Sequence, residues 1–297
     1  MNVVIKVDDE TKKKMIEYYE DKKRDKTPPY AIFQAQEEDT IITLYESGKA
    51  MFQGTSAFVD ANMWQAQIDN DKEDIDQNDY MNVDAIGSDE VGTGDYFGPI
   101  VVTASYVKKE DIDFLKKLGC NDSKKLTDDK IKKIAPEIIK KIPYKSIILS
   151  NEEYNEKHSS DNNMNKIKAI MHNKVLKQLL DQYERPEYVI IDEFCKENRY
   201  YEYLKEAKDI VKDITFITKA ETKNLAVAAS SIISRYIFIE EFDKMCDFYH
   251  IPLVKGSGPA VDTIGQELVE KYGRDVLDKT AKKNFSNTER ILRTKIV

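Results

Sequence analysis

The hydrophobic positions of this chain recur with two different periods, and together they predict a mixed α/β protein. The run Tyr188–Ile191 is short, continuous and apolar, which is typical of a strand buried on both faces. Residues 225–242 place apolar side chains every three or four positions, which is typical of a helix. Such strands and helices alternate after residue 80, so this part of the chain is expected to form a sheet flanked by helices.

The α/β domain is expected to span residues 81–297. Its predicted strands are one running from Val83 toward Glu90, then Ile100–Val107, Ser146–Leu149, Tyr188–Ile191 and Ile214–Ile217. Its predicted helices are Asp111–Leu118, one beginning after Thr127, Lys166–Tyr183, Leu225–Phe242 and Val261–Tyr272. Pro136 counts against a continuous helix after Thr127, because proline removes a backbone donor. Small residues at 226–231 would let the longest helix approach the sheet closely.

The first 68 residues follow a different order and predict a separate α+β domain, residues 1–68. A strand, a helix, three strands and a closing helix would form a curved sheet backed by two helices. The expected strands are Asn2–Lys6, Tyr30–Gln36, Thr40–Tyr45 and Ala50–Gln53. The expected helices are one capped by Asp8 or Asp9 that runs to about Lys23, and Thr55–Ile68. Such a unit is compatible with a structural role as well as with ligand binding.

Residues 69–80 are expected to link the two domains. This segment holds six acids, one lysine and one aliphatic residue, and it shows neither a helical nor a strand period. A cation-binding role is the less favoured alternative, because the segment lacks the glycine placement of a calcium-binding loop.

The net charge of −8 argues at first against a nucleic-acid partner. The charge distribution weakens this objection, because residues 81–297 hold 36 basic and 36 acidic side chains while the short linker alone holds −5. Basic clusters outside the linker can therefore still face a phosphate backbone.

Hydrophobic residues make up 41% of the chain, which is enough for a core, but no apolar run approaches the length of a membrane span. The N-terminus lacks the apolar stretch of a signal peptide. The three cysteines, Cys120, Cys195 and Cys246, are far apart and form no C-x-x-C pair. This usage favours a reducing cytosol, so we expect a cytoplasmic protein without disulfides or a zinc site.

Four acids stand out by their positions along the chain. Asp89 and Glu90 fall at the end of the first strand of the α/β domain, and Asp192 directly follows a buried strand. If these two strands are parallel, their ends meet at one edge of the sheet, where α/β proteins place their sites. Glu221 precedes the longest helix by one turn, and an interaction with the helix dipole explains it equally well.

Converging carboxylates without histidine or cysteine favour hard cations, so magnesium or manganese is expected rather than zinc. Two such ions could activate a water and stabilise the leaving oxygen of a displacement at phosphorus. Directly after the first two acids, Gly92-Thr93-Gly94 would let backbone groups approach a ligand. Taken alone, such a pair of glycines is more typical of an ordinary hairpin turn.

The stretch that begins at Asp89, D-E-x-G-x-G-x-x-x-G-P, resembles the first active-site motif of the type 2 ribonucleases H. Thr93, where arginine is usual, and a glutamate as the fourth acid resemble the ribonuclease HIII branch. The resemblance implies a ribonuclease H-like mixed sheet with flanking helices. It also implies catalysis and metal binding by Asp89, Glu90, Asp192 and Glu221.

The same resemblance implies contacts with nucleic acid. Backbone groups of Gly92, Thr93 and Gly94 would contact a ribose 2′-hydroxyl, which distinguishes RNA from DNA. Residues 122–126 are similar to the family's D-S-K-x-L element, in which Ser123 and Lys124 would contact the phosphate near the scissile bond. A solvated, lysine-rich loop is the alternative explanation of that segment.

The first domain carries a second resemblance, in the segment L-Y-x-S-G-K-x-x-F-Q-G that begins at Leu44. It is similar to the N-terminal domain of ribonuclease HIII proteins, which itself resembles half of the TATA-binding protein. The resemblance implies a substrate-binding domain in which Tyr45 and Lys49 would contact the nucleic-acid backbone.

Two other residues are of types that can take part in chemistry. His172 lies in a stretch that is also similar to the HIII branch, where it could shuttle protons, but it falls on a predicted helix and could simply pack there. Cys195 has no recognisable base beside it, which argues against a thiol nucleophile.

Over nearly its whole length the chain is therefore similar to the ribonuclease HIII family. The implied activity is cleavage of the RNA strand of RNA/DNA hybrids by a monomer with two Mg²⁺ or Mn²⁺ ions, which leaves 5′-phosphate and 3′-hydroxyl ends. One alternative is the HII-type excision of single ribonucleotides embedded in DNA. The other is a protein that binds hybrids without cutting them, against which the intact set of four acids argues.

Overall fold

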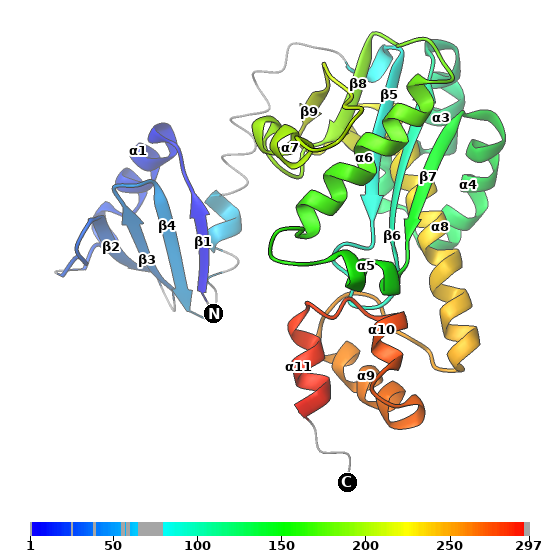
Figure 1. Ribbon diagram of the computed structural model, residues 1–297. Coiled ribbons are helices and arrows are strands. Elements are labelled where there is room, and N and C mark those ends of the chain that lie inside the picture. The colour runs from blue at the N-terminus through cyan, green and yellow to red at the C-terminus, as the bar shows by residue number, and fades with distance from the viewer. Residues whose placement is uncertain are drawn as a thin grey trace. The chain divides into compact units, whose positions relative to one another are not determined.

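The computed structural model describes residues 2–24, 26–37, 40–54, 57, 60–64 and 80–293. The chain divides into two compact units, residues 1–78 and 79–297 (Figure 1). The predicted linker, residues 69–80, lies outside the described residues except for Tyr80, which is buried in the second unit. Of the predicted helix Thr55–Ile68, residues 57 and 60–64 are described, and these are helical. Within the described ranges no helix is long and apolar enough to cross a membrane.

The first unit is a four-stranded antiparallel sheet in the strand order β1-β4-β3-β2 (Figure 1). Its strands are β1 (Asn2–Lys6), β2 (Ala31–Glu37), β3 (Thr40–Tyr45) and β4 (Lys49–Gly54). Helix α1 (Asp9–Tyr18) is capped by Asp8, whose carboxylate accepts a hydrogen bond from the Thr11 N–H at 2.9 Å. A 3-10 helix, η1 (Glu20–Lys22), follows α1, so the α-helix is shorter than predicted.

The core of the first unit lies on the helical side of its sheet. Leu44 and Phe52 point into this core from neighbouring strands, and Trp64 packs beside them. The Trp64 indole N–H donates to the Tyr19 hydroxyl at 2.9 Å, which satisfies two polar groups inside the core. The prediction that the first residues form a small α+β unit is therefore confirmed.

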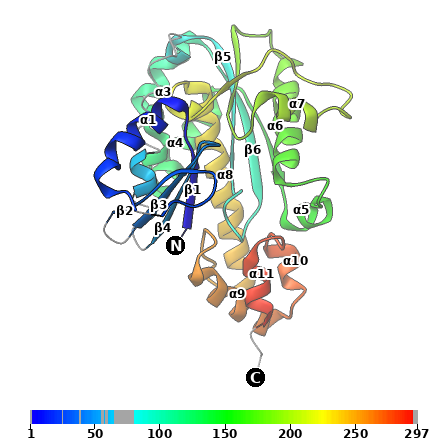
Figure 2. The same ribbon diagram turned by 90° about the vertical axis from the view of Figure 1, so that its left-hand side faces the viewer.

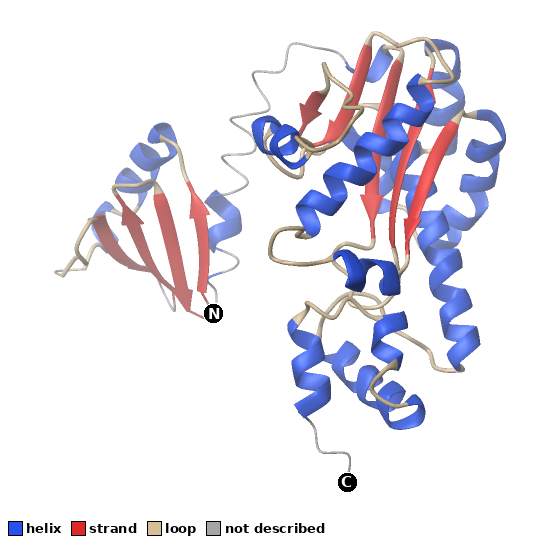
Figure 3. Ribbon diagram, viewed as in Figure 1, coloured by secondary structure: helices blue, strands red, loops and turns tan. Residues whose placement is uncertain are grey.

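The second unit is built on a five-stranded mixed sheet in the order β7-β6-β5-β8-β9 (Figure 3). Its strands are β5 (Ala85–Val91), β6 (Ile100–Val107), β7 (Tyr144–Leu149), β8 (Tyr188–Asp192) and β9 (Thr215–Ile217). Strand β6 is antiparallel to both β5 and β7, whereas β8 is parallel to β5 and to β9. The mixed sheet and its central hairpin confirm the predicted fold class. The connection between β5 and β6 spans residues 92–99, and Gly92-Thr93-Gly94 form its first part.

Helices cover both faces of this sheet (Figure 2). One face packs against α6 (Met164–Leu180) and α7 (Glu197–Tyr203); the other packs against α3 (Ile112–Leu118), α4 (Asp128–Lys141) and α8 (Leu225–Tyr249). Helix α8 extends past its predicted end at Phe242. Its backbone approaches β5 so closely that a Cβ on Gly87 would lie 2.4 Å from the Val227 nitrogen, so the fold requires glycine at that position.

Several helices were missing from the predicted pattern. Helix α5 (Asn151–Lys157) follows β7 and begins with Ser150 as its cap. The C-terminal region was expected to hold one helix, but its described residues form α9 (Pro259–Tyr272), α10 (Val276–Thr280) and α11 (Ser286–Arg293). These helices were missed because α5, α10 and α11 are too short to show a clear helical period.

The helix predicted after Thr127 is confirmed, and Pro136 does not interrupt it. The helix runs unbroken from Asp128 to Lys141, with Thr127 as its predicted cap. Ile131, Ile134 and Ile138 are buried in the core, and this packing outweighs the backbone hydrogen bond that the proline removes.

Candidate active site

The parallel pairing of β5 and β8 brings two of the predicted acids to one edge of the sheet. Ser88 lies opposite Ile191 in the register, and the next residues along the two strands are Asp89 and Asp192. The Asp192 carboxylate lies close enough to raise the pKa of Asp89. The expectation that these two strand ends meet is therefore confirmed.

Asp89 is a buried carboxylate in an unfavourable electrostatic environment. Burial raises its pKa well above the usual range, and the negative charges of Glu90 and Asp192 raise it further. Hydrogen bonds from the Ser231 hydroxyl and from the Glu90 N–H, at 2.7 Å, offset part of this effect. A cation bound among the carboxylates would compensate the cluster far more effectively.

Glu90 has two basic partners of its own. Its carboxylate forms an ion pair with Lys168, and its second oxygen lies 2.9 Å from His172 Nε2. Burial raises the pKa of this carboxyl, but His172 and Lys168 outweigh burial and bring the pKa to about 2. The other ring nitrogen, His172 Nδ1, lies 2.8 Å from the Ser88 hydroxyl. Lys168 and His172 therefore keep the Glu90 carboxyl ionised and fix the direction in which it points.

An aromatic side chain holds the two basic partners of Glu90 in place. Lys168 and His172 lie one turn apart on α6, and Phe194 follows β8. The Phe194 ring stacks on His172 at a centroid distance of 5.3 Å, and the Lys168 ammonium lies 4.1 Å from the same ring's centroid. His172 is 0% exposed and both its nitrogens are engaged, which favours a positioning role over proton transfer.

Sequence reasoning left His172 undecided and assigned no role to Lys168 or Phe194. The signal that could have found the first two was their i, i+4 spacing on a predicted helix, which places both on one face. Phe194 gave no such signal, because its contact with α6 depends on how β8 and α6 pack together.

Asp192 forms a hydrogen bond with the short segment before α8 that also carries Glu221. The Asp192 carboxylate accepts a hydrogen bond from the Ala220 N–H at 2.8 Å. Ala220 opens the 3-10 helix η5 (Ala220–Thr222), which also carries Glu221, a residue that is only 2% exposed. Asn224 caps the start of α8. The start of this helix therefore does not depend on Glu221.

The donor types at this edge fit a hard divalent cation. Among the described residues, no three side chains of histidine, cysteine, aspartate or glutamate already form a closed ligand set. All four candidates are nevertheless carboxylates. Asp89 is repelled by the neighbouring carboxylates, and a cation bound among them would attract all of these negative charges.

The fold requires glycine at only one of the two glycine positions in the turn after β5. Gly92 has a φ of 95°, and a Cβ there would lie 2.2 Å from the Pro99 carbonyl oxygen, so the fold itself demands glycine. Gly94 is exposed, and no atom lies within 4 Å of where its Cβ would be. The fold would accept a side chain at residue 94. Its bare backbone, beside the partly buried Thr93, is therefore the part of the turn that is open to a ligand.

The loop that carries Ser123 adjoins the acidic cluster. Ser123 is buried in the 3-10 helix η4 (Cys120–Lys125) and borders a cavity of about 180 Å³ together with Ser231 and Arg235. Because Ser231 also hydrogen-bonds to Asp89, this cavity lies next to the carboxylates. Within the described part of the chain the buried Ser123 hydroxyl makes no hydrogen bond, and its contact with a phosphate stays a prediction. The side chain of Lys124 lies outside the described residues, and its phosphate contact stays a prediction.

The candidate contacts of the first unit lie on the sheet face opposite its core. Leu44 and Phe52 of the sequence motif are buried in the core, so the alternate residues Tyr45 and Lys49 point to the other face. Lys49 is exposed and pairs with Lys6 in the β1–β4 register. Two like charges side by side on a sheet are unfavourable, and an anion lying across them would relieve the repulsion.

The three cysteines are free thiols, and burial raises the pKa of each of them: Cys120, Cys195 and Cys246. A thiol with a raised pKa stays protonated at neutral pH and is a poor nucleophile. The raised pKa of Cys195 thus counts against the nucleophilic role that the sequence also disfavours.

Known proteins are similar to this chain in both sequence and fold. The family described as Ribonuclease HII matches residues 86–288, and a domain of unknown function, DUF3378, matches residues 2–76. Ribonuclease HIII of Listeria monocytogenes serotype 4b is 41% identical over 98% of each chain, and that of Bacillus cereus is 40% identical over 98% of each. The crystal structure of Bst-RNase HIII in complex with Mn²⁺ superposes with a TM-score of 0.70 at 37% identity, over 98% of both chains.

The mixed sheet with acids at the β5–β8 edge defines a ribonuclease H-like nuclease, a class of hydrolase. RNase H3 of Aquifex aeolicus, at 20% identity and a TM-score of 0.56 over 96% of this chain and 100% of that one, shares the fold. The chain belongs to the ribonuclease HIII family and is an endoribonuclease.

Proposed function

We propose that this endoribonuclease cleaves the RNA strand of RNA/DNA hybrids and leaves 5′-phosphate and 3′-hydroxyl ends. The observation that carries the proposal is the cluster of Asp89, Glu90 and Asp192 at one sheet edge, in a chain similar to ribonuclease HIII over 98% of its length. Hydrolysis of a phosphodiester by water requires charge stabilisation more than a nucleophilic side chain, and carboxylates that bind divalent cations meet that requirement.

Two magnesium or manganese ions would be held by the four candidate carboxylates, Asp89, Glu90, Asp192 and Glu221. Bst-RNase HIII, a relative with 37% identity, was crystallised with Mn²⁺. When bound, the ions would supply an activated water and stabilise the departing oxygen. The protein's part is to fix the ligands. Lys168 and His172 hold Glu90, and the Ala220 N–H holds Asp192.

Substrate contacts in the second unit are assigned to the glycine turn and to the Ser123 loop. The exposed backbone at Gly94, with Gly92 and Thr93 before it, would contact a ribose 2′-hydroxyl. Ser123 and Lys124 would hold the phosphate beside the scissile bond, and the cavity next to Ser231 supports this placement.

A long ribonucleotide run in a hybrid is expected to be cut at least about tenfold faster than a single ribonucleotide embedded in DNA. The single ribonucleotide offers one 2′-hydroxyl and a mostly B-like duplex, and losing one well-formed hydrogen bond already costs about that factor. The measurement compares initial rates on two duplexes of equal length in magnesium and in manganese. Efficient incision at the 5′ side of the single ribonucleotide would assign the HII-type activity instead. Binding of the hybrid without any cleavage would favour the non-catalytic alternative.

The open sheet face of the first unit is assigned the task of holding the substrate backbone through Tyr45 and Lys49. Lys49→Ala is expected to weaken hybrid binding and to leave the rate at saturating substrate unchanged, because the carboxylates all belong to the second unit. The slope of log affinity against log salt should become shallower by about 0.7 to 0.9 for each lost phosphate contact. Lys13, exposed on α1, offers a control with the same change in charge. Native affinity in both Lys49→Ala and Tyr45→Ala would remove this face from substrate binding.

A further inference from the structure

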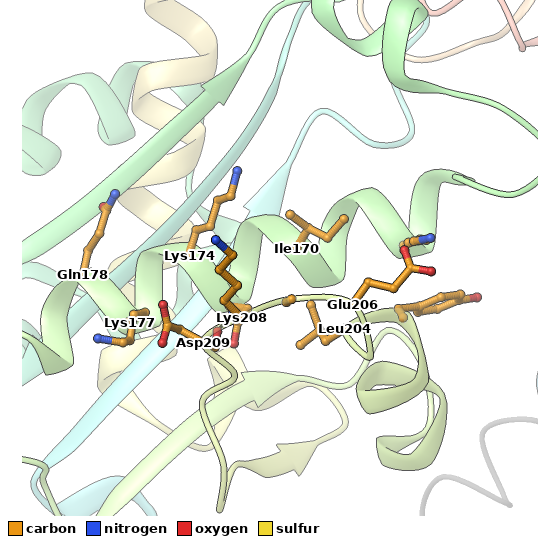
Figure 4. Close-up of a pocket in the computed structure, with 12 residues that line it drawn as sticks. Ile170, Lys174, Lys177, Gln178, Leu204, Glu206, Lys208 and Asp209 are labelled. Atoms are coloured by element: carbon orange, nitrogen blue, oxygen red, sulfur yellow. Dashed lines mark hydrogen bonds between the residues drawn. The ribbon is translucent and has the colours of Figure 1, made fainter.

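A pocket of about 500 Å³ lies between α6 and residues 203–209 of the second unit (Figure 4). Ile170 faces it from α6, and Leu204 and Ala207 face it from the opposite wall, so its floor is apolar. None of the residues proposed to bind metal or hybrid lines it. We call this site the α6 pocket.

The α6 pocket is held open by a buried amide. The Asn173 side chain donates to the Asp209 carbonyl at 2.8 Å and accepts from the Val211 N–H at 2.9 Å. These two bonds fix the segment that forms the second wall, and Leu204 in that wall is itself buried in the core. The pocket is therefore a preformed part of the fold, which lowers the cost of ordering on binding.

The rim of the α6 pocket is rich in lysine. Four lysines line it, and two carboxylates, Glu206 and Asp209, lie among them. One of the four, Lys177, is paired with Asp181 on its own helix. The other three form no ion pair with any described residue: Lys166, Lys174 and Lys208. Figure 4 shows Lys174 on α6 and Lys208 on the facing segment. Cations gathered from two walls of one preformed pocket favour an anionic ligand.

We propose that the α6 pocket binds a nucleotide, with its phosphates among Lys166, Lys174 and Lys208 and its base or sugar on the floor. Inorganic phosphate would use the lysines but leave the apolar floor unfilled, whereas a volume of about 500 Å³ suits a ligand with an apolar body. A long nucleic-acid backbone crossing the rim would meet Glu206 and Asp209, while a single nucleotide can seat its charge between the lysines.

The nucleotide can come from two sources with the same chemistry. It can be a free nucleotide, or it can be the phosphorylated terminal nucleotide of a strand. Both place a phosphate group beside a base, so the lysines and the floor recognise them alike. The site is independent of the proposed cleavage reaction, because no carboxylate of the catalytic cluster lines the pocket.

The test is calorimetric titration of the full chain in metal-free buffer, where ATP cannot be drawn to the carboxylates by a bound cation. ATP is the probe, and adenosine and pyrophosphate are the probes that lack one half of it. The variant is Lys174→Ala combined with Lys208→Ala, both at the pocket rim. Lys205→Ala is the matched control, because Lys205 is exposed in the same segment and does not line the pocket. A tetranucleotide with a 5′-phosphate, compared with its 5′-hydroxyl form, tests the second source.

ATP is expected to bind at least tenfold more weakly to the double variant than to the native protein and to the control variant. Adenosine and pyrophosphate should each bind more weakly than ATP. A stronger signal for the phosphorylated tetranucleotide than for its 5′-hydroxyl form supports a strand end as the source. The proposal is overturned if neither ATP nor the phosphorylated tetranucleotide binds, if the double variant binds them as the native protein does, or if pyrophosphate binds as tightly as ATP. Hybrid cleavage by the double variant should stay native, which separates this site from the catalytic one.

Discussion

Asp89→Asn and Glu90→Gln are expected to abolish turnover alike but to change the stability of the metal-free protein in opposite directions. Each change replaces an anionic oxygen by an amide that binds a divalent cation poorly, so a fall in kcat of about 10³-fold or more is expected for both. In the metal-free protein, however, Asp89 is repelled by Glu90 and Asp192, whereas Glu90 is attracted by Lys168 and His172. Removing the Asp89 charge should therefore stabilise the fold, and removing the Glu90 charge should destabilise it.

The destabilisation by Glu90→Gln is expected to reach about 3 kcal/mol, because it leaves the buried Lys168 without its ionic partner. Urea unfolding followed by circular dichroism, with and without divalent metal, measures both effects. Trp64 is the single tryptophan of the chain and lies in the first unit, so its fluorescence reports a unit that neither substitution touches. Asp192→Asn and Glu221→Gln should lose turnover to the same degree. Native cleavage by Asp192→Asn, or a less stable metal-free Asp89→Asn protein, would contradict this description of the cluster.

The main features of the second unit could be predicted because they follow from local patterns. The run Tyr188–Ile191 is continuously apolar, which marks a strand buried on both faces, and Asp192 ends it. Asp89 and Glu90 end another strand in the same way, and parallel pairing then brings the acids together. The long helix was predictable because residues 225–242 show an extended helical period.

The side-chain contacts that hold Glu90 in place could not be predicted. The support of Glu90 joins β5 to α6 and depends on Phe194, which follows β8. Tertiary structure also decides that residue 92 must be glycine whereas residue 94 need not be. Pro99 and Phe238 lie where a side chain of residue 92 would begin, but no atom lies within 4 Å of the corresponding position at residue 94. A sequence motif shows which residues are present. Only the packing shows which of these residues the fold requires and which can contact a ligand.

Lys282 is another residue whose role only tertiary structure reveals. It is 0% exposed, and its ammonium donates to the carbonyl oxygens of Asp95 at 2.8 Å and Gly98 at 2.5 Å. Its backbone N–H donates to the Tyr96 carbonyl at 2.9 Å. The residue thus ties the C-terminal region to the connection between β5 and β6, which begins with the glycine turn.

The stability of Lys282→Met relative to the native protein is expected to rise as the pH falls from 9 to 6. Burial lowers the pKa of Lys282 from 10.5 to about 7, although the negative charge of Asp95 opposes this shift. Between these two values the unfolded chain carries the proton and the folded protein does not, so lowering the pH favours unfolding of the native protein. At 1.36 kcal/mol per pKa unit, the relative gain of the variant from pH 9 to pH 6 is about 2–3 kcal/mol.

Urea unfolding at both pH values, followed by circular dichroism, measures this difference. The carbonyls of Asp95 and Gly98 lose a donor in the variant at every pH, which costs about 1–3 kcal/mol but cancels in the comparison across pH. Lys283→Met is the matched control, because Lys283 is the neighbouring lysine and is exposed. A stability difference between Lys282→Met and the native protein that is equal at pH 6 and pH 9 would show that Lys282 carries its charge throughout. Its burial would then be compensated by the carbonyl oxygens alone.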